Sequence, residues 1–141
     1  MTSFTLRLKE INREYKLRMQ VVLQEATQEL VRQVQVTTGE GGRMRVVTGF
    51  LRGSIRGAIN QVPMGDSDNP TGRIVNSDAS TESISVALLK WDPNKGDDFY
   101  VGWTANYARF REYHDRFLGL AVQNWDMIVD DTVKSVRGRR G

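Results

Sequence analysis

Cysteine is absent from this 141-residue chain, and histidine occurs once, at His114. Without cysteine the chain can form no disulfide, thiol nucleophile or cysteine-ligated zinc or iron–sulfur site. One histidine also leaves no Ser–His–acid arrangement with a supporting residue that we can name. The aspartate pairs at positions 97–98 and 130–131 would point in different directions in a strand or helix, which makes them poor acid–base pairs. We therefore expect no enzyme activity, no cofactor and no metal site.

Long apolar runs are missing too. No stretch approaches the roughly 20 apolar residues that a helix needs to cross a bilayer, and the opening MTSFTLRLKE lacks the apolar core of a secretory signal. Hydrophobic residues make up 39% of the chain and charged residues 26%, as in globular proteins. The length suits one domain with its own core. We expect a soluble single domain over residues 1–141 with no membrane partner.

The net charge is only +3, but it is unevenly distributed. Residues 1–60 carry ten lysines and arginines against five acidic residues, whereas residues 61–136 carry seven against twelve. Three further arginines follow, at positions 137, 139 and 140. Oppositely charged segments can pair with copies of the same chain head to tail, or can neutralise each other within one folded subunit. The sequence leaves both alternatives open.

The longest helical pattern lies in residues 1–36. Apolar residues recur there at spacings of three and four, which places them on one stripe, and no glycine or proline interrupts the pattern. Such a helix would extend roughly 50 Å at 1.5 Å per residue, which is longer than a small domain needs. We therefore expect it to bend or to pack partly on a neighbouring subunit. The stripe comprises Phe4, Leu8, Ile11, Tyr15, Met19, Val22, Ala26, Leu30 and Val34.

Residues 43–104 predict a sheet with long loops. Residues 53–61 alternate apolar or small side chains with basic and polar ones. SISVALLKW (83–91) alternates Ile84, Val86 and Leu88 on one phase, and FYVGWT (99–104) is rich in β-branched and aromatic residues. The turn between the last two indicates an antiparallel pair, and a fourth, short strand could lie at 72–76. Loop residues 43–47 and 64–71 contain little apolar surface, so we expect them to be mobile until neighbours order them.

Residues 115–136 predict the last helix, and residues 137–141 a frayed basic tail. Phe117, Ala121, Trp125, Ile128 and Thr132 share one face of this helix, which should cover the sheet. The predicted fold class is thus α+β, with a long N-terminal helix, a small antiparallel sheet of three or four strands and a C-terminal helix packed on the sheet.

The most specific stretch is VVTGFLRGSI, residues 46–55. It resembles the V-D-T-G-x-L-R-x-S-I signature of phage tail-completion and head–tail joining proteins of the HK97 gp10-like family. Val47 stands where that signature has an acidic residue. The matching residues are Thr48, Gly49, Leu51, Arg52, Ser54 and Ile55.

Two later segments agree with this resemblance. Residues 106–113 are similar to the family's Y-A-x-x-x-E-x-G segment, and residues 117–121 to the F-L-x-x-A opening of its last helix. Tyr113 and His114 stand where a glycine is common, and the prolines usual before the Phe-Leu pair are absent. The matching residues are Tyr107, Ala108, Glu112, Phe117, Leu118 and Ala121.

The resemblance implies a structural virion protein of a tailed phage or phage-derived particle, assembled in the host cytoplasm. It implies a homo-oligomeric, six-fold ring at the head–tail junction, in the neck or tail, around the DNA channel. The implied partners are other copies of the chain, a head connector or stopper protein, a tail terminator or tail tube protein, and genome DNA in weak non-specific contact. The alternative is a small nucleic-acid-binding module that uses the basic strand and the C-terminal tail, although the net charge is low for that class.

Both functions would use exposed arginines on the strand and the tail. In a ring they would face the channel, and replacing all five with alanine should leave folding intact. These candidate channel- or DNA-facing residues are Arg52, Arg56, Arg137, Arg139 and Arg140.

Overall fold

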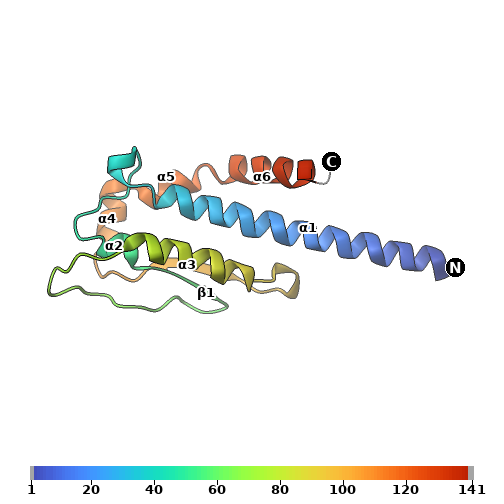
Figure 1. The fold of residues 1–141 in the computed structure, drawn as a ribbon, viewed down its shortest axis with the longest axis horizontal. Helices are drawn as coiled ribbons and strands as arrows, with labels where there is room; N and C mark the ends of the chain where they lie inside the picture. The colour runs from blue at the N-terminus through green and yellow to red at the C-terminus, as the bar shows by residue number, and fades with distance from the viewer. Residues whose placement is uncertain (1, 140–141) are drawn as a thin grey trace.

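The computed structural model describes the backbone of residues 2–139 and the side chains of residues 7–139. Within this range six α-helices account for most of the chain, which is 60% helical, and two short strands and two 3-10 turns join them (Figure 1). No helix of the described range has both the length and the hydropathy that crossing a bilayer demands. In chain order the elements are α1 (Thr2–Val34), η1 (Thr38–Glu40), α2 (Phe50–Gly53), β1 (Ile55–Ile59), α3 (Ser77–Leu89), η2 (Pro93–Lys95), β2 (Phe99–Trp103), α4 (Ala108–Asp115), α5 (Phe117–Val122) and α6 (Trp125–Arg139).

Helix α1 confirms the long N-terminal helix and is the axis of the molecule. Its C-terminal half lies between α6 on one side and α3 on the other, while its N-terminal half extends past both (Figure 1). Gln24 Nε2 donates a hydrogen bond to the Trp91 carbonyl at 3.0 Å, and Gln28 Nε2 donates to Ser85 Oγ at 2.8 Å. The stripe behaves differently in the two halves: Ala26 and Val34 are buried, whereas Tyr15 is 61% exposed. Phe4 lies outside the residues whose side chains are described.

The predicted α+β class is wrong, because the described sheet has only two strands. β1 pairs with β2 in antiparallel register, with Ile55 opposite Trp103 and Ile59 opposite Phe99. These strands confirm the predictions for residues 53–61 and 99–104, but they pair with each other across a long connection. Residues 72–76 form no strand. The hairpin expected between 83–91 and 99–104 does not exist, since residues 77–89 are helical.

Helix α3 replaces that predicted strand. Ile84 and Leu88 are each only 2% exposed, whereas Val86 between them is 59% exposed. Positions four apart share a face in a helix as well as in a strand, so the alternation of apolar residues could not separate the two structures. Asn76 caps the helix, since its side-chain oxygen accepts a hydrogen bond from the Ala79 N–H. The polar residues 77–82 therefore form the first turns of a helix rather than a loop.

The C-terminal segment also differs from its prediction. It is split into α5 and α6 at Gln123 and Asn124, and α6 lies along α1 instead of on the sheet (Figure 1). Helix α6 continues to Arg139, whose guanidinium forms an ion pair with Glu25 of α1 at 2.8 Å. Residues 137–139 are therefore part of a packed helix, not a frayed tail, and Arg140 and Gly141 lie outside the described residues.

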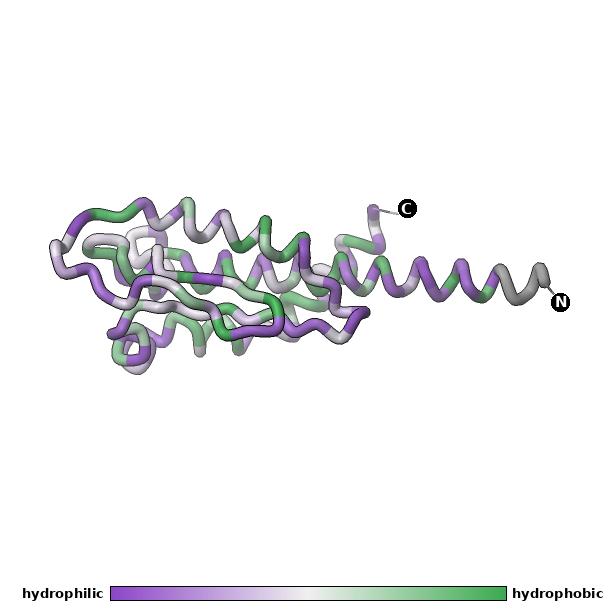
Figure 2. The backbone as a smooth tube through the Cα atoms, turned by 90° about the horizontal axis from the view of Figure 1, so that it is seen from below, coloured by the Kyte–Doolittle hydropathy of each residue, from purple (hydrophilic) through white to green (hydrophobic). Residues whose placement is uncertain are grey.

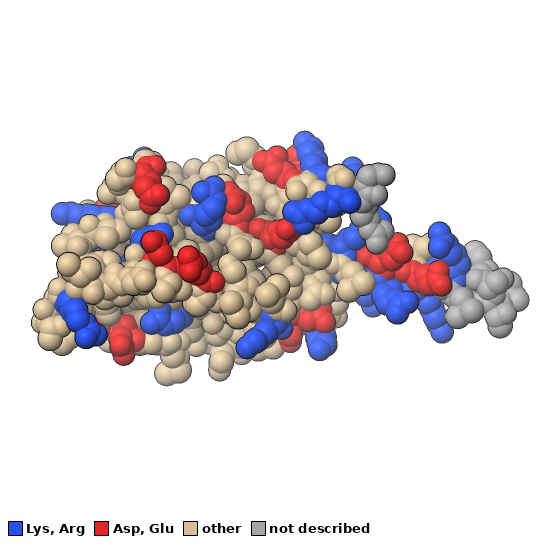
Figure 3. Space-filling model, viewed as in Figure 1, with Lys and Arg blue, Asp and Glu red and all other residues tan. Residues whose placement is uncertain are grey.

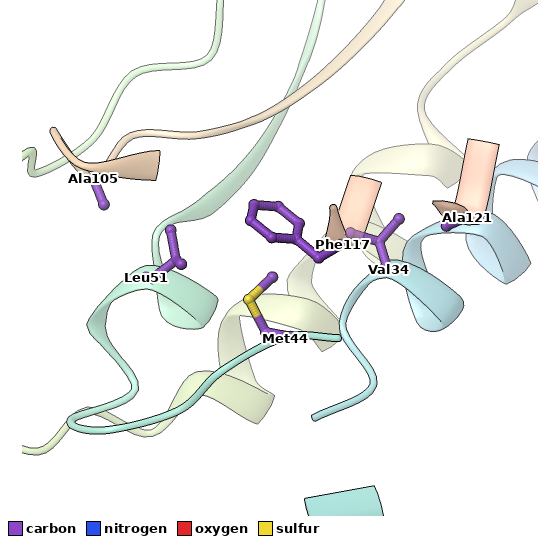
Figure 4. Close-up of a cluster of buried hydrophobic side chains, with 6 residues drawn as sticks. All are labelled: Val34, Met44, Leu51, Ala105, Phe117 and Ala121. Carbon is purple, nitrogen blue, oxygen red and sulfur yellow. The ribbon is translucent and has the colours of Figure 1, made fainter. Parts of the chain in front are cut away.

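The core consists of two clusters on either side of the end of α1. One joins Val31 to Ile55, Ile84 and Leu88 and fills the space between α1, α3 and the sheet. The other lies where α1, α2 and α5 meet (Figure 4), and it includes Met44, which is fully buried. The segment 43–47 is therefore held by a core residue. We had expected it to be mobile because it contains little apolar surface, and the burial of Met44 removes that reason. Figure 2 shows hydrophobic and hydrophilic positions alternating along the projecting part of α1.

Candidate functional site

The two motif segments, residues 48–55 and 107–121, meet at one place that we call the motif junction. Leu51 from α2 and Phe117 and Ala121 from α5 belong to the same buried cluster, together with Val34 at the end of α1 (Figure 4). The Trp103 ring of β2 packs edge-on against Phe117, with ring centroids 5.1 Å apart. Residues that lie far apart in the sequence thus share one packing unit.

Thr48 and Gly49 form the sharp entry into α2. Gly49 has φ +83°, a left-handed conformation that side chains resist, and an added Cβ would lie 2.6 Å from the Val75 carbonyl oxygen. The Thr48 hydroxyl accepts a hydrogen bond from the Phe50 N–H at 3.2 Å. The Thr48 carbonyl accepts another from the Val75 N–H at 2.7 Å, which brings the segment before α3 against the turn. Both residues therefore have a structural role that other types would not fill.

Arg52 is directed into the protein. Its Nε donates to the Gln35 carbonyl at 2.7 Å, and its Nη1 donates to Ser77 Oγ at 2.8 Å and forms an ion pair with Asp78. The Arg52 side chain is only 12% exposed. A guanidinium with these three partners ties the end of α1 to the start of α3, so Arg52 is engaged within the subunit and not free on its surface.

Ser54 and Ile55 carry the chain from α2 into β1. Ser54 is 2% exposed, and its hydroxyl donates to the Leu51 carbonyl at 2.7 Å. Its own carbonyl accepts from the Thr104 N–H at 3.1 Å, which extends the pairing of the strands by one bond. Ile55 is fully buried in the cluster beneath α3.

Tyr107 and Ala108 start α4 against the outer side of α2. The Tyr107 and Phe50 ring centroids lie 6.4 Å apart, and Ala108 packs against the cluster around Leu51. Burial is the main cause that raises the pKa of the Tyr107 hydroxyl, opposed by a hydrogen bond with the Leu51 backbone.

Glu112 connects α4 to α5. Its carboxylate oxygens accept hydrogen bonds from the Leu118 N–H at 2.8 Å and the Gly119 N–H at 2.9 Å, two of the N–H groups that the first turn of α5 leaves unpaired. Arg116, between the two helices, has φ +54°. The carboxylate therefore stabilises a sharp turn that places Phe117 in the core, which gives the Glu-to-Phe-Leu spacing of the motif a physical reason.

The five candidate channel arginines are not brought together. Arg56 donates to the carbonyls of Gly53 at 2.7 Å and Ile55 at 2.8 Å, and Arg139 is paired with Glu25. Arg137 is exposed on α6, at the far side of α1 from β1, and Arg140 lies outside the described residues. With Arg52 also engaged, the described arginines of this set do not form one basic surface.

Two hollows within the described residues border the motif junction. One of about 420 Å³ lies between Ser54, Arg56 and the loop that contains Asp66 and Asp68. The other, of about 130 Å³, lies beside Thr48, Gly49 and Tyr107, with Arg45 and Arg111 at its edge, whereas small-molecule sites usually measure about 300–1,000 Å³. Among residues 7–139 no group of three or more His, Asp or Glu residues is arranged to hold a metal ion. The buried contacts and hydrogen bonds of Leu51, Ser54 and Glu112 give the motif residues a packing role.

Gln35 is the residue of the junction that the sequence did not reveal. It is 1% exposed. Its Nε2 donates to the Arg52 carbonyl and to Thr81 Oγ1, both at 2.8 Å, and its Oε1 accepts from Trp103 Nε1 at 2.9 Å. The sequence contains no signal for it, because Gln35 lies off the predicted stripe, on the side of the helix where the structure buries Val31 against Ile84 and Leu88.

No protein-family model matches the chain, and neither a curated protein nor a solved structure is similar to it.

Proposed function

We propose that the chain is a structural virion protein of a tailed phage or phage-derived particle. It forms a homo-oligomeric ring of six subunits at the head–tail junction, around the channel through which DNA passes. Its neighbours are a head connector or stopper protein on one side and a tail terminator or tail tube protein on the other, and its contact with DNA is weak. Its activity is binding, not catalysis.

The observation that carries this proposal is the contact between the two motif segments. They resemble parts of one family signature, and in this fold Leu51 of the first packs in the same cluster as Phe117 of the second. Other motif residues shape the same region. Gly49 permits the turn into α2, and Glu112 caps α5. One signature requires its two parts to meet in the fold, and the contact meets that requirement, so it supports treating them as one signature.

The surrounding charges favour this function over the nucleic-acid-binding alternative. A non-specific DNA binder needs several cations free to replace counterions on phosphates. Arg52 and Arg139, which we had assigned to such a surface, form ion pairs within the subunit instead. A ring would lose the same two arginines from its channel surface, but it is held together by contacts between subunits and does not depend on these side chains.

Deletion of the gene tests the proposal. We expect particles made without the protein to accumulate as DNA-filled heads and separate tails in electron micrographs, and a plasmid-borne wild-type copy to restore joined particles. As a matched pair, a copy carrying Gly102→Ala should also restore joining, whereas one carrying Gly49→Ala should not. Normally joined, infectious particles that lack the protein by mass spectrometry would refute the proposal.

A further inference from the structure

The N-terminal half of α1 has few contacts with the rest of the subunit. Asn94 of η2 donates a hydrogen bond to the Lys16 carbonyl at 2.9 Å, but no described element covers the apolar side chains of this half. All side chains from Arg7 to Met19 are exposed, and this part of the helix projects beyond the rest of the molecule (Figure 1, Figure 2). Helices of this length are marginally stable in water unless an apolar face is packed. We call residues 7–19 the bare half.

The apolar stripe of α1 continues through the bare half. Leu8, Ile11 and Tyr15 are 51%, 50% and 61% exposed. Met19 lies eleven residues after Leu8, and Ala26 lies eleven residues after Tyr15. Ala26 is fully buried. An 11-residue repeat keeps a stripe almost straight along a helix. The exposed residues therefore lie on the face of α1 that is covered further along the same subunit.

The charges of the bare half are sorted around this stripe. At 3.6 residues per turn, Arg7 and Arg18 lie on one flank of the stripe and Lys9 and Lys16 on the other, while Glu10 and Glu14 fall on the opposite face. Five cations against two glutamates give residues 7–19 a formal charge of +3, and Figure 3 shows the basic side chains on the projecting helix. The complementary surface is apolar along its middle and acidic at its edges.

The end of α5 and the start of α6 present such a surface. Val122 and Met127 are 46% and 59% exposed there. Asp126, Asp130 and Asp131 are exposed beside them and give residues 122–131 a formal charge of −3. Lys134 forms an ion pair with Asp130 at 3.0 Å, which leaves Asp126 and Asp131 to supply the negative charge of this surface. We call this surface the acidic face, and it consists of Val122, Asp126, Met127, Asp130 and Asp131.

Other surfaces of the same chain fit less well. Phe110 and Tyr113 of α4 are 59% and 81% exposed, but Arg109 and Arg116 lie beside them and would repel the bare half. Two bare halves packed on each other would each bring a charge of +3. Like charges at close range destabilise a contact, so a symmetric contact between bare halves is disfavoured.

We propose that the bare half of α1 in one subunit packs on the acidic face in a second copy of the chain. The two patches are different, so the contact is heterologous: each subunit keeps one free bare half and one free acidic face until the assembly closes. Since a closed ring needs contacts of this type, the interface rests on the proposed function. It adds which surfaces meet and explains why α1 exceeds the length of its own subunit.

Mixing two variants, each defective in one patch, tests the interface. The helix variant carries Leu8→Gln, Ile11→Gln and Tyr15→Gln, which keep good helix propensity. The face variant carries Asp126→Lys and Asp130→Lys. All five side chains are exposed, and the ion pair of Asp130 with Lys134 that the face variant loses is a surface pair that contributes little to stability. Folding should therefore persist, which circular dichroism and the thermal midpoint would check. Leu17→Gln is the matched control, because Leu17 is 56% exposed on the opposite side of the helix.

In sedimentation velocity, wild type and the Leu17→Gln variant should assemble, and each defective variant alone should remain monomeric, with assembly weakened about 100-fold or more. An equimolar mixture of the two defective variants has one productive contact, so it should form a dimer and nothing larger. Wild-type-like assembly of either defective variant alone would overturn the interface, as would a mixture that stays monomeric.

Two further results separate this interface from the proposed function. A wild-type subunit that is monomeric at every concentration would overturn the interface. The role in head–tail joining would still be tested separately, by deletion of the gene. A basic amphipathic helix also fits an anionic bilayer. Binding of phosphatidylserine vesicles by wild type, lost in the helix variant and without any self-association, would replace the second copy with a lipid surface.

Discussion

Gln35 and Arg52 exchange hydrogen bonds between the end of α1 and α2. The Gln35 side-chain amide donates to the Arg52 carbonyl at 2.8 Å, and the Arg52 guanidinium donates to the Gln35 carbonyl at 2.7 Å. The same two side chains reach α3 and β2 through Thr81, Asp78 and Trp103. The pair therefore holds α1, α2, α3 and β2 together. The side chain of Arg52 is used for these contacts within the fold and not for binding at the surface.

Gln35→Leu should destabilise the protein strongly. The substitution removes three hydrogen bonds and leaves the Trp103 N–H, the Thr81 hydroxyl and the Arg52 carbonyl without their buried partner. Unpaired buried polar groups cost about 1–3 kcal/mol each, with partial relaxation, so we expect a loss of about 3 kcal/mol in the free energy of unfolding by urea titration. Gln28→Leu, at an exposed position with one bond to Ser85, should cost less than about 1 kcal/mol. Equal losses for both variants would contradict the role of Gln35.

Arg52→Lys should behave as a folding defect. A lysine ammonium cannot reproduce the fork that contacts Gln35, Ser77 and Asp78 together. We expect a loss of about 2 kcal/mol in unfolding free energy and no change in duplex DNA affinity of the folded protein. Arg137→Lys, on the exposed end of α6, should leave stability unchanged. A stable Arg52→Lys variant with weakened DNA binding would restore the channel assignment. It follows that replacing all five candidate arginines with alanine should impair folding.

Gly49→Ala should be among the most damaging glycine substitutions. The new methyl group would lie 2.6 Å from the Val75 carbonyl in a backbone conformation of φ +83°. Strain of this kind costs roughly 1–3 kcal/mol, and the close contact adds to it, so the thermal midpoint should fall by about 10 °C or more. Gly102→Ala meets no atom within 4 Å and should shift the midpoint by only a few degrees. A Gly49→Ala variant as stable as Gly102→Ala would show that the turn can relax.

Glu112→Gln should weaken the turn between α4 and α5. Both carboxylate oxygens accept backbone N–H groups of α5, and the glutamine side chain can supply only one such acceptor. We expect a loss of about 1–2 kcal/mol in unfolding free energy, together with faster hydrogen exchange at the amides of Leu118 and Gly119. Glu82→Gln, at an exposed position of α3, is the control and should change neither quantity. Unchanged exchange at the two amides in the Glu112 variant would contradict the cap.

The sequence correctly predicted those helices and strands whose residue pattern fits only one type of secondary structure. An uninterrupted stripe at spacings of three and four predicted α1, alternation predicted β1, and aromatic and β-branched composition predicted β2. Helix α3 was missed because Ile84 and Leu88 fit both periods, and the helix is decided by packing against α1 and the sheet, which no local pattern contains. The position of α6 also depends on packing, since an apolar face does not specify whether a sheet or another helix covers it.

The candidate site was only half visible in the sequence. The motif residues were recognised, but their roles were not, because the contacts of Arg52 and Glu112 join segments that the chain brings together only on folding. Met44 showed the same limit: one methionine among polar neighbours gave no sign of its full burial. We therefore predicted that Arg52 faces a channel or DNA, whereas its hydrogen-bond partners lie within the subunit.

Native mass spectrometry of the purified protein at low and high salt tests the central claim most directly. A ring component with a basic bare half and an acidic face should give one closed oligomer, expected to be a hexamer, which dissociates as salt screens the charges. A protein that is monomeric at every salt concentration, and that joins neither purified heads nor purified tails, would contradict the assignment to a ring at the head–tail junction.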